Sequence, residues 1–309
     1  MTIEQTINYL SKKYATTNIK HIGGGSDSQA FVLDNEYIIR FLTNKNNVYE
    51  NEKQICDFIS QYISIETPHI EIVKSDGYTF SKHKMIKGNT WSWHSFTFNH
   101  KKQQNLANSL AKFMAELHSI PVKDLQNNIQ NSPYMDIEKI IPYISPNLTK
   151  HQLEFFTKKY DQIINKTPNK SDMVLCHLGI KNANSVVDDS GALCGIFDFG
   201  NCGIYERWRD LAVIYSFRNY RLYKAVARAY TKYTDIKVDH KRVADLAYFE
   251  WLSKKRWYNK DKFTPRKDYS KVLASTFGHF YKLPWIIHRT ILFEIISLRG
   301  KLYRKLNNK

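Results

Sequence analysis

Apolar positions recur along this chain in patterns that predict short strands first and helices afterwards. Residues 2–14 carry isoleucine and leucine at helical spacing, which predicts an N-terminal helix. A second helical pattern covers residues 49–63. Apolar runs bounded by turn residues predict strands over residues 19–22, 30–33, 37–42, 69–73 and 78–86. The first part of the chain is therefore expected to form a small antiparallel sheet with an accompanying helix.

The rest of the chain is predicted to be mainly helical. Its strongest amphipathic pattern runs over residues 101–118. Two short apolar strands, residues 173–176 and 193–197, are expected to pair as a hairpin. Further helices are expected over residues 150–164, 211–217, 221–233, 241–257 and 271–280. The prediction is an α+β chain, with a lobe formed by residues 1–87 and a larger helical lobe formed by residues 88–309.

A glycine-rich turn separates the first two predicted strands. Gly23, Gly24 and Gly25 are followed by Ser26 and Asp27. Backbone N–H groups in such a turn can approach phosphate oxygens without obstruction by side chains, and Ser26 adds a hydroxyl. A plain turn explains the same residues, so the turn by itself leaves both interpretations open.

Polar side chains gather in the loops that follow the two predicted strands at 173–176 and 193–197. The expected hairpin brings His177, Asn184 and Asp198 close together. Hard cations take oxygen ligands, and an amide and a carboxylate supply them. Asp198 also begins an Asp-Phe-Gly sequence, so these loops predict a site for magnesium and phosphate.

The spacing of these residues resembles the catalytic and metal-binding segment of the aminoglycoside phosphotransferase family, which has the protein-kinase-like two-lobed fold. Family members carry His-x-Asp, then an Asn, then a metal-binding Asp before Gly, then Asp-Leu-Ala. Here His177, Asn184, Asp198 and Asp210 fall in register. The resemblance reaches nearly the whole chain, to about Phe280. It implies transfer of the terminal phosphate of ATP, or of GTP, with Mg²⁺, to a hydroxyl of a small molecule.

The resemblance also implies roles for individual residues. Asn184 and Asp198 correspond to the metal ligands, Arg40 to the cation for the nucleotide phosphates, and Glu52 to the acid that orients this cation. A hinge is expected at residues 87–89. The other implied site residues are Gly24, Gly25 and Ser26 in the phosphate turn, Met85 and Lys87 beside the base, Lys181 beside the transferred phosphate, and His177 and Asp210 as supports of the catalytic loop. By contrast, His118 is interpreted as a packed residue at a helix end.

One position departs from the family pattern, because Gly179 stands where the family has its catalytic Asp. A positioned base contributes about a hundred-fold to ten-thousand-fold, whereas positioning and metal electrostatics carry most of phosphoryl transfer. Three interpretations stay open: a pseudokinase that binds nucleotide without turnover, a slow or differently arranged phosphotransferase, and a degenerating protein that keeps its fold. The spacing of His177, Asn184 and Asp198 disfavours a shifted register.

The formal net charge of +17 leaves the partner open. It fits an anionic substrate, nucleic acid or a membrane surface, and equally a solvated face rich in lysine and asparagine. No RNA-recognition signature is identified, so no specific nucleic-acid partner is expected. The charge speaks against polycationic aminoglycosides as the acceptor. Residues 283–309 combine apolar residues with clustered cations, which fits a C-terminal helix packed on the lobe or an interfacial helix at an anionic membrane.

Four cysteines without C-x-x-C spacing predict reduced thiols rather than disulfides or a zinc site. No signal sequence and no long apolar run are found, so a cytoplasmic location is expected. The membrane interpretation of residues 283–309 would add peripheral contact at the inner membrane face. The sequence makes no prediction of the oligomeric state.

Overall fold

The computed structural model describes residues 2–24, 28–42, 48–91, 99–121, 123, 141–142, 150–164, 168–216 and 220–255. The strands are β1 (Ile19–Gly24), β2 (Ser28–Leu33), β3 (Tyr37–Leu42), β4 (Glu71–Ser75), β5 (Tyr78–Lys84), β6 (Met173–Cys176), β7 (Ser185–Val187), β8 (Leu193–Ile196) and β9 (Gly203–Glu206). The helices are α1 (Ile3–Tyr14), α2 (Val48–Ile59), α3 (His100–Ser119), α5 (Lys150–Ile164), α6 (Trp208–Ser216), α7 (Tyr220–Thr234) and α8 (His240–Lys255). These elements confirm the predicted α+β class.

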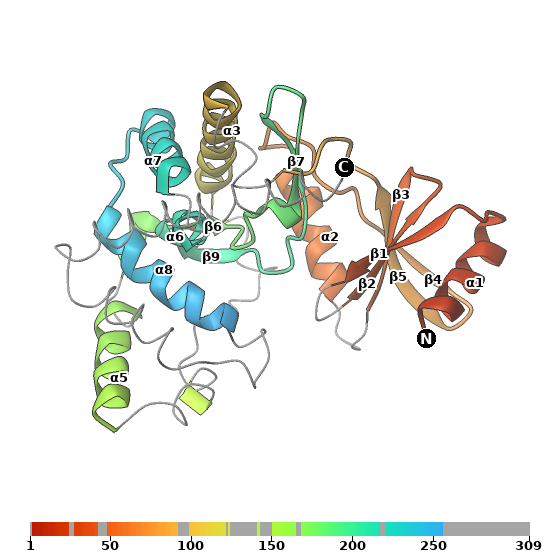
Figure 1. The fold of residues 1–309 in the computed structure, drawn as a ribbon, viewed down its shortest axis with the longest axis horizontal. Helices are drawn as coiled ribbons and strands as arrows, with labels where there is room; N and C mark the ends of the chain where they lie inside the picture. Colours follow the sequence, from red (N-terminus) through yellow and green to blue (C-terminus); the bar gives the residue numbers. More distant parts are fainter. Residues whose placement is uncertain are drawn as a thin grey trace, which may run out of the picture.

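The N-terminal part of the chain forms a five-stranded antiparallel sheet in the order β1-β2-β3-β5-β4. Helix α1 lies against this sheet, and α2 lies between the sheet and the helical part of the molecule (Figure 1). Leu10 of α1 is buried with Phe31, Ile39 and Phe80 from the strands. Fully burying such a side chain stabilises the fold by about 1.5–3 kcal/mol, so this cluster holds α1 on the sheet.

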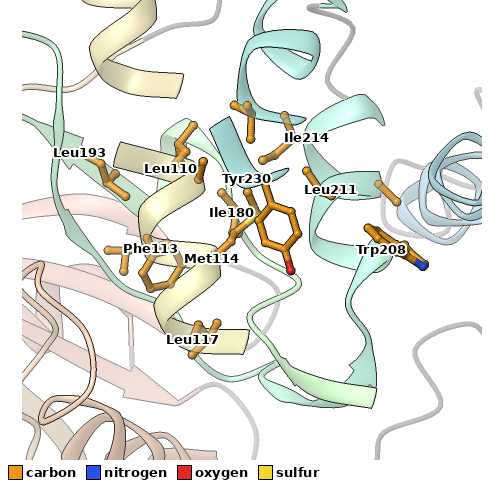
Figure 2. Close-up of a cluster of buried hydrophobic side chains, with 14 of the residues drawn as sticks. Leu110, Phe113, Met114, Leu117, Ile180, Leu193, Trp208, Leu211, Ile214 and Tyr230 are labelled. Carbon is orange, nitrogen blue, oxygen red and sulfur yellow. The ribbon is translucent and has the colours of Figure 1, made fainter. Parts of the chain in front are cut away.

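The helical part is built around α3, whose apolar positions recur at helical spacing. Leu110, Phe113, Met114 and Leu117 of α3 are fully buried, and they pack together with Tyr230 of α7 in one core (Figure 2). None of the helices in the described part of the chain is long and apolar enough to cross a membrane.

The pairing of the two short strands differs from the predicted hairpin. β6 pairs with β9, where Cys176 lies opposite Gly203, and β8 pairs with β7, where Ile196 lies opposite Ser185. The prediction that residues 173–176 and 193–197 pair with each other was therefore wrong. The reason is that the buried residues of β7 form a strand of their own and turn back through Gly191, whose φ of +85° suits glycine.

Several predicted bounds also shift. Helix α2 ends at Ile59 rather than at residue 63, and α6 begins at Trp208, so Asp210 lies inside the helix rather than before it. The predictions for Gly25, Ser26, residues 271–280 and residues 283–309 lie outside the described residues. The cytoplasmic location and the membrane contact stay predictions.

Candidate functional site

One carboxylate joins the sheet, α2 and the segment after β8. The Nη1 of Arg40 in β3 donates to both oxygens of Glu52, at 3.0 and 2.8 Å. The same Glu52 accepts the backbone N–H of Phe199 at 3.2 Å. Burial alone would lower the pKa of Arg40, but the carboxylates of Glu52 and Asp198 raise it above its ordinary value. Within the described chain the Nε and Nη2 of Arg40 make no hydrogen bond, so this cation can donate to an anion.

Asn184 and Asp198 lie in direct contact, as predicted, but the hairpin that brings them together is β7–β8 rather than the predicted pairing of residues 173–176 with 193–197. The Nδ2 of Asn184 donates to Asp198 Oδ2 at 2.9 Å and to the carbonyl of Gly179 at 3.0 Å. No described group donates to the Oδ1 of Asn184 or to the Oδ1 of Asp198, so both oxygens are available to a cation. Asp198 adopts a φ of 69°, a left-handed conformation that is uncommon outside glycine. Such strained backbone is often found at functional sites.

The loop around Gly179 is packed without space for a side chain. The N–H of Gly179 donates to Nδ1 of His177 at 3.0 Å. A Cβ at Gly179 would lie 2.9 Å from His177 Cε1 and 3.1 Å from Asn184 Nδ2. Burial lowers the pKa of His177, which favours the neutral ring, and because Nδ1 accepts the N–H of Gly179 the ring proton lies on Nε2. Within the described residues this Nε2 has no hydrogen-bond partner.

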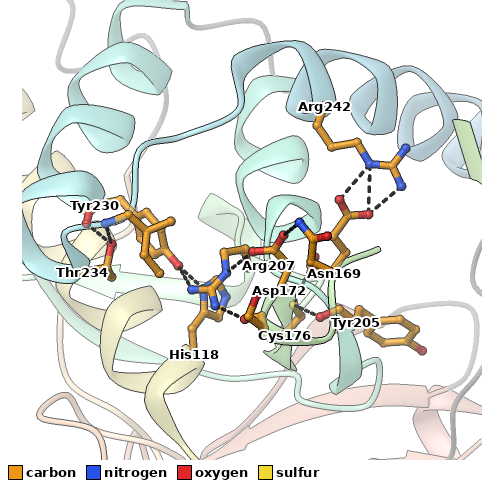
Figure 3. Close-up of polar contacts among 12 residues, drawn as sticks. His118, Asn169, Asp172, Cys176, Tyr205, Arg207, Tyr230, Thr234 and Arg242 are labelled. Carbon is orange, nitrogen blue, oxygen red and sulfur yellow. Dashed lines mark hydrogen bonds and ion pairs between the residues drawn. The ribbon is translucent and has the colours of Figure 1, made fainter. Parts of the chain in front are cut away.

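Asp210 holds the backbone of the same loop from α6. Its carboxylate accepts the N–H of His177 at 2.9 Å and that of Leu178 at 2.7 Å. It also accepts the Nε2 of His118 at 3.2 Å (Figure 3 shows His118). Burial alone would raise the pKa of Asp210, but the hydrogen bonds from the His118 ring and from the His177 backbone lower it below the ordinary value. A charged carboxylate therefore fixes Leu178 in its left-handed conformation, at a φ of 57°.

A polar chain continues from His118 to Tyr230 of α7, then to Arg207 after β9 and to Asp172 just before β6, as Figure 3 shows. The hydroxyl of Tyr230 lies 2.8 Å from His118 Nδ1 and accepts Arg207 Nη1 at 3.2 Å. Arg207 also pairs with Asp172 at 3.1 Å. Since Arg207 donates to Tyr230, Tyr230 donates to His118, whose other nitrogen donates to Asp210. His118 is a packed residue at a helix end, as predicted, but it also supports Asp210.

The other predicted site residues are placed less directly. Residue 24 has room only for glycine, because a Cβ added there would lie 2.2 Å from the carbonyl oxygen of Ser28. The N–H of Met85 donates to the carbonyl of Glu36 at 2.7 Å, so this N–H is not free to bind a nucleotide base. Lys87 is exposed, and the side chain of Lys181 is half-buried and makes no hydrogen bond or ion pair within the described chain.

The sequence did not predict the contacts that three groups make at this site. The Phe199 N–H is a backbone group, so its contact with Glu52 depends on tertiary placement. His118 is far from the loop in sequence. The third group is Trp91, whose Nε1 donates to the hydroxyl of Ser185 at 3.1 Å. The run of aromatic residues around Trp91 gave no indication that its indole reaches the metal-binding loop.

Glu52→Gln is expected to lower the free energy of unfolding by about 2 kcal/mol, the scale of hydrogen bonds to charged groups. The amide turns one acceptor of Arg40 and Phe199 into a donor. Urea unfolding measures the loss. The control is Glu71→Gln on the exposed side of β4, where a change within about 0.5 kcal/mol is expected. An equal effect of both substitutions would mean that the contacts of Glu52 with Arg40 and Phe199 do not stabilise the fold.

Comparison with known proteins identifies similar sequences and folds. A sequence model of the phosphotransferase enzyme family matches residues 18–246. The GDP complex of wild-type aminoglycoside 2'-phosphotransferase-IIIa is 17% identical, with a TM-score of 0.70 over 89% of this chain and 98% of that one. ADP-bound aminoglycoside phosphotransferase APH(2'')-Ib is 19% identical, with a TM-score of 0.64 over 89% and 98%. The apoenzyme of macrolide 2'-phosphotransferase MphH from Brachybacterium faecium is 10% identical, with a TM-score of 0.56 over 90% and 99%. The predicted protein-kinase-like fold is confirmed.

Proposed function

The chain belongs to the phosphotransferase enzyme family, and from this premise we propose that it binds a Mg²⁺–nucleotide complex at Asn184 and Asp198. The observation that carries the proposal is the 2.9 Å contact between these two side chains, which leaves one oxygen on each for a cation. ATP and GTP are the candidate nucleotides. Support comes from relatives whose structures are GDP and ADP complexes.

The residues present fit a magnesium ion. Mg²⁺ prefers oxygen donors and is commonly bound through one or two carboxylates together with the phosphates of the nucleotide. Asn184 and Asp198 offer an amide oxygen and a carboxylate, and Arg40 adds a cation held by Glu52. When bound, the ion would neutralise phosphate charge. Around it, Arg40 would bind phosphate, Glu52 would orient Arg40, and Asp210 would hold the loop.

The acceptor is proposed to be the hydroxyl of a small molecule. Aminoglycosides and macrolides are the compounds named for the relatives. The net charge of +17 favours an acceptor that is not itself a polycation. Lys181 is proposed to lie beside the transferred phosphate.

A second candidate function is nucleotide binding without fast turnover, and one observation favours it. The ring of His177 lies where a side chain at residue 179 would begin, and Gly179 itself has no group that could accept a proton. Under this proposal the chain is a pseudokinase whose nucleotide site serves binding or regulation.

Asp198→Ala is expected to abolish the gain in thermal stability that Mg²⁺ gives in the presence of ATP. Nucleotide at about 100 times its Kd stabilises a protein by about 2.7 kcal/mol, which a thermal-shift titration with ATP or GTP detects. The matched control is Glu154→Ala at an exposed position of α5, which should keep the wild-type response. The proposal is overturned if the wild type gains no stability from either nucleotide, or if Asp198→Ala keeps the magnesium-dependent gain.

A further inference from the structure

The segment that follows β5 meets β7 at one backbone bridge. Asn89 and Val187 exchange backbone hydrogen bonds, with N···O distances of 2.7 and 3.0 Å. This single bridge is antiparallel, so the chain beyond Asn89 runs toward Ser185, and the side chain of Trp91 contacts Ser185 there. The bridge thus holds the connection between the sheet and the helices where the indole of Trp91 reaches Ser185, the residue that follows Asn184.

A chain of hydrogen bonds then leads from Trp91 into the metal-binding loop. Trp91 Nε1 donates to the hydroxyl of Ser185 at 3.1 Å, and this hydroxyl donates to the carbonyl of Lys181 at 2.9 Å. The same carbonyl accepts the N–H of Asn184 at 2.9 Å. Both Trp91 and Ser185 are buried, at 4% and 1% exposure. Water therefore does not compete for the bond between Trp91 and Ser185.

We propose that Trp91 is a positioning residue for Asn184, acting through the Ser185 hydroxyl. The Ser185 hydroxyl has one proton, and the indole donor fixes its direction toward Lys181. That bond closes the short turn Asn182–Asn184, and the turn sets where the amide of Asn184 meets Asp198. The segment expected to contact the nucleotide base is in this way tied to the residue expected to bind the metal. The inference rests on the proposed binding of a Mg²⁺–nucleotide complex.

The test measures the Kd of ATP by calorimetry, once with Mg²⁺ and once with a chelator. The quantity compared is the Kd with chelator divided by the Kd with Mg²⁺, which exceeds one when Mg²⁺ strengthens binding. Trp91→Phe keeps a buried ring but removes the donor, and it is expected to lower this ratio by about tenfold, as loss of an outer support of a metal ligand does. The Kd with chelator should stay within about twofold of the wild type. Ser185→Ala should lower the ratio equally. The double variant should lower it no further than either single change, since both break one chain.

Trp208→Phe in α6 is the matched control, because its indole is also buried but makes no hydrogen bond within the described chain. Hydrogen exchange of the nucleotide-free protein adds a second readout: the amide of Asn184 should exchange faster in Trp91→Phe and as in the wild type in Trp208→Phe. A wild-type ratio of one overturns the proposed function and this role with it. Two results would overturn only the role of Trp91. One is a wild-type ratio above one that Trp91→Phe leaves unchanged, and the other is additive effects of Trp91→Phe and Ser185→Ala.

Discussion

Asp210→Asn is expected to destabilise the protein by about 3–5 kcal/mol, the scale observed when one partner of a buried ionic group is removed. The carboxylate of Asp210 is fully buried and accepts three donors, the backbone N–H groups of His177 and Leu178 and the Nε2 of His118. The asparagine amide keeps the shape but places an NH₂ group against one of these donors. Urea unfolding measures the loss, and hydrogen exchange at His177 and Leu178 locates it.

The pH dependence of this effect has a defined sign. The pKa of Asp210 is lower in the folded protein than its ordinary value of about 3.9, so the carboxylate stabilises the fold above that value. The contribution is lost as the pH falls through the folded pKa. The stability difference between wild type and Asp210→Asn should therefore be constant near neutral pH and shrink below about pH 4.

Asp245→Asn in α8 is the matched control for Asp210→Asn. Asp245 is half-buried and makes no hydrogen bond or ion pair within the described chain, so its substitution should change stability by less than about 0.5 kcal/mol. If Asp210→Asn cost no more than this control, the carboxylate would not hold the loop.

Local patterning in the sequence was sufficient for most elements of the fold. The helix Lys150–Ile164 and the strand Met173–Cys176 have the predicted bounds, because a run of apolar positions with one period suffices to define each of them. The contact of Arg40 with Glu52 was predicted from the family resemblance, and that of Asn184 with Asp198 from the polar loops around the two short strands. The roles of these residues in binding stay predictions.

What the sequence could not give depends on partners distant in the chain. The partner of β6 is β9, and nothing in either strand distinguishes it from β8 as a partner. The left-handed backbone of Leu178 and Asp198 is imposed by surrounding contacts, since neither residue type favours it as glycine does. The departure at Gly179 was visible from the sequence, but the position of the His177 ring beside it was not.

Gly179→Asp is expected to keep phosphate transfer to small hydroxyl compounds within about tenfold of the wild type, rather than to add the hundred-fold to ten-thousand-fold of a positioned base. The added Cβ would lie 2.9 Å from Cε1 of His177, a fully buried ring whose centroid is 4.5 Å from that of Phe199. Overpacking of this kind costs about 1–3 kcal/mol. The new carboxylate would also sit near Asp198, because Asn184 Nδ2 contacts Asp198 and would lie 3.1 Å from the new Cβ.

Two further variants separate the Cβ from the carboxylate. Gly179→Ala should reproduce the loss of stability in urea unfolding, because the Cβ alone makes the close contacts with His177 and Asn184. In a His177→Ala background the cost of Gly179→Ala should fall by about 1 kcal/mol or more, since the ring that the Cβ meets is gone. A hundred-fold rise in turnover of Gly179→Asp at unchanged stability would mean that the loop accepts a base after all. A loss of stability without a gain in turnover would mean that the loop is packed around Gly179, so that restoring the carboxylate alone does not restore a working base.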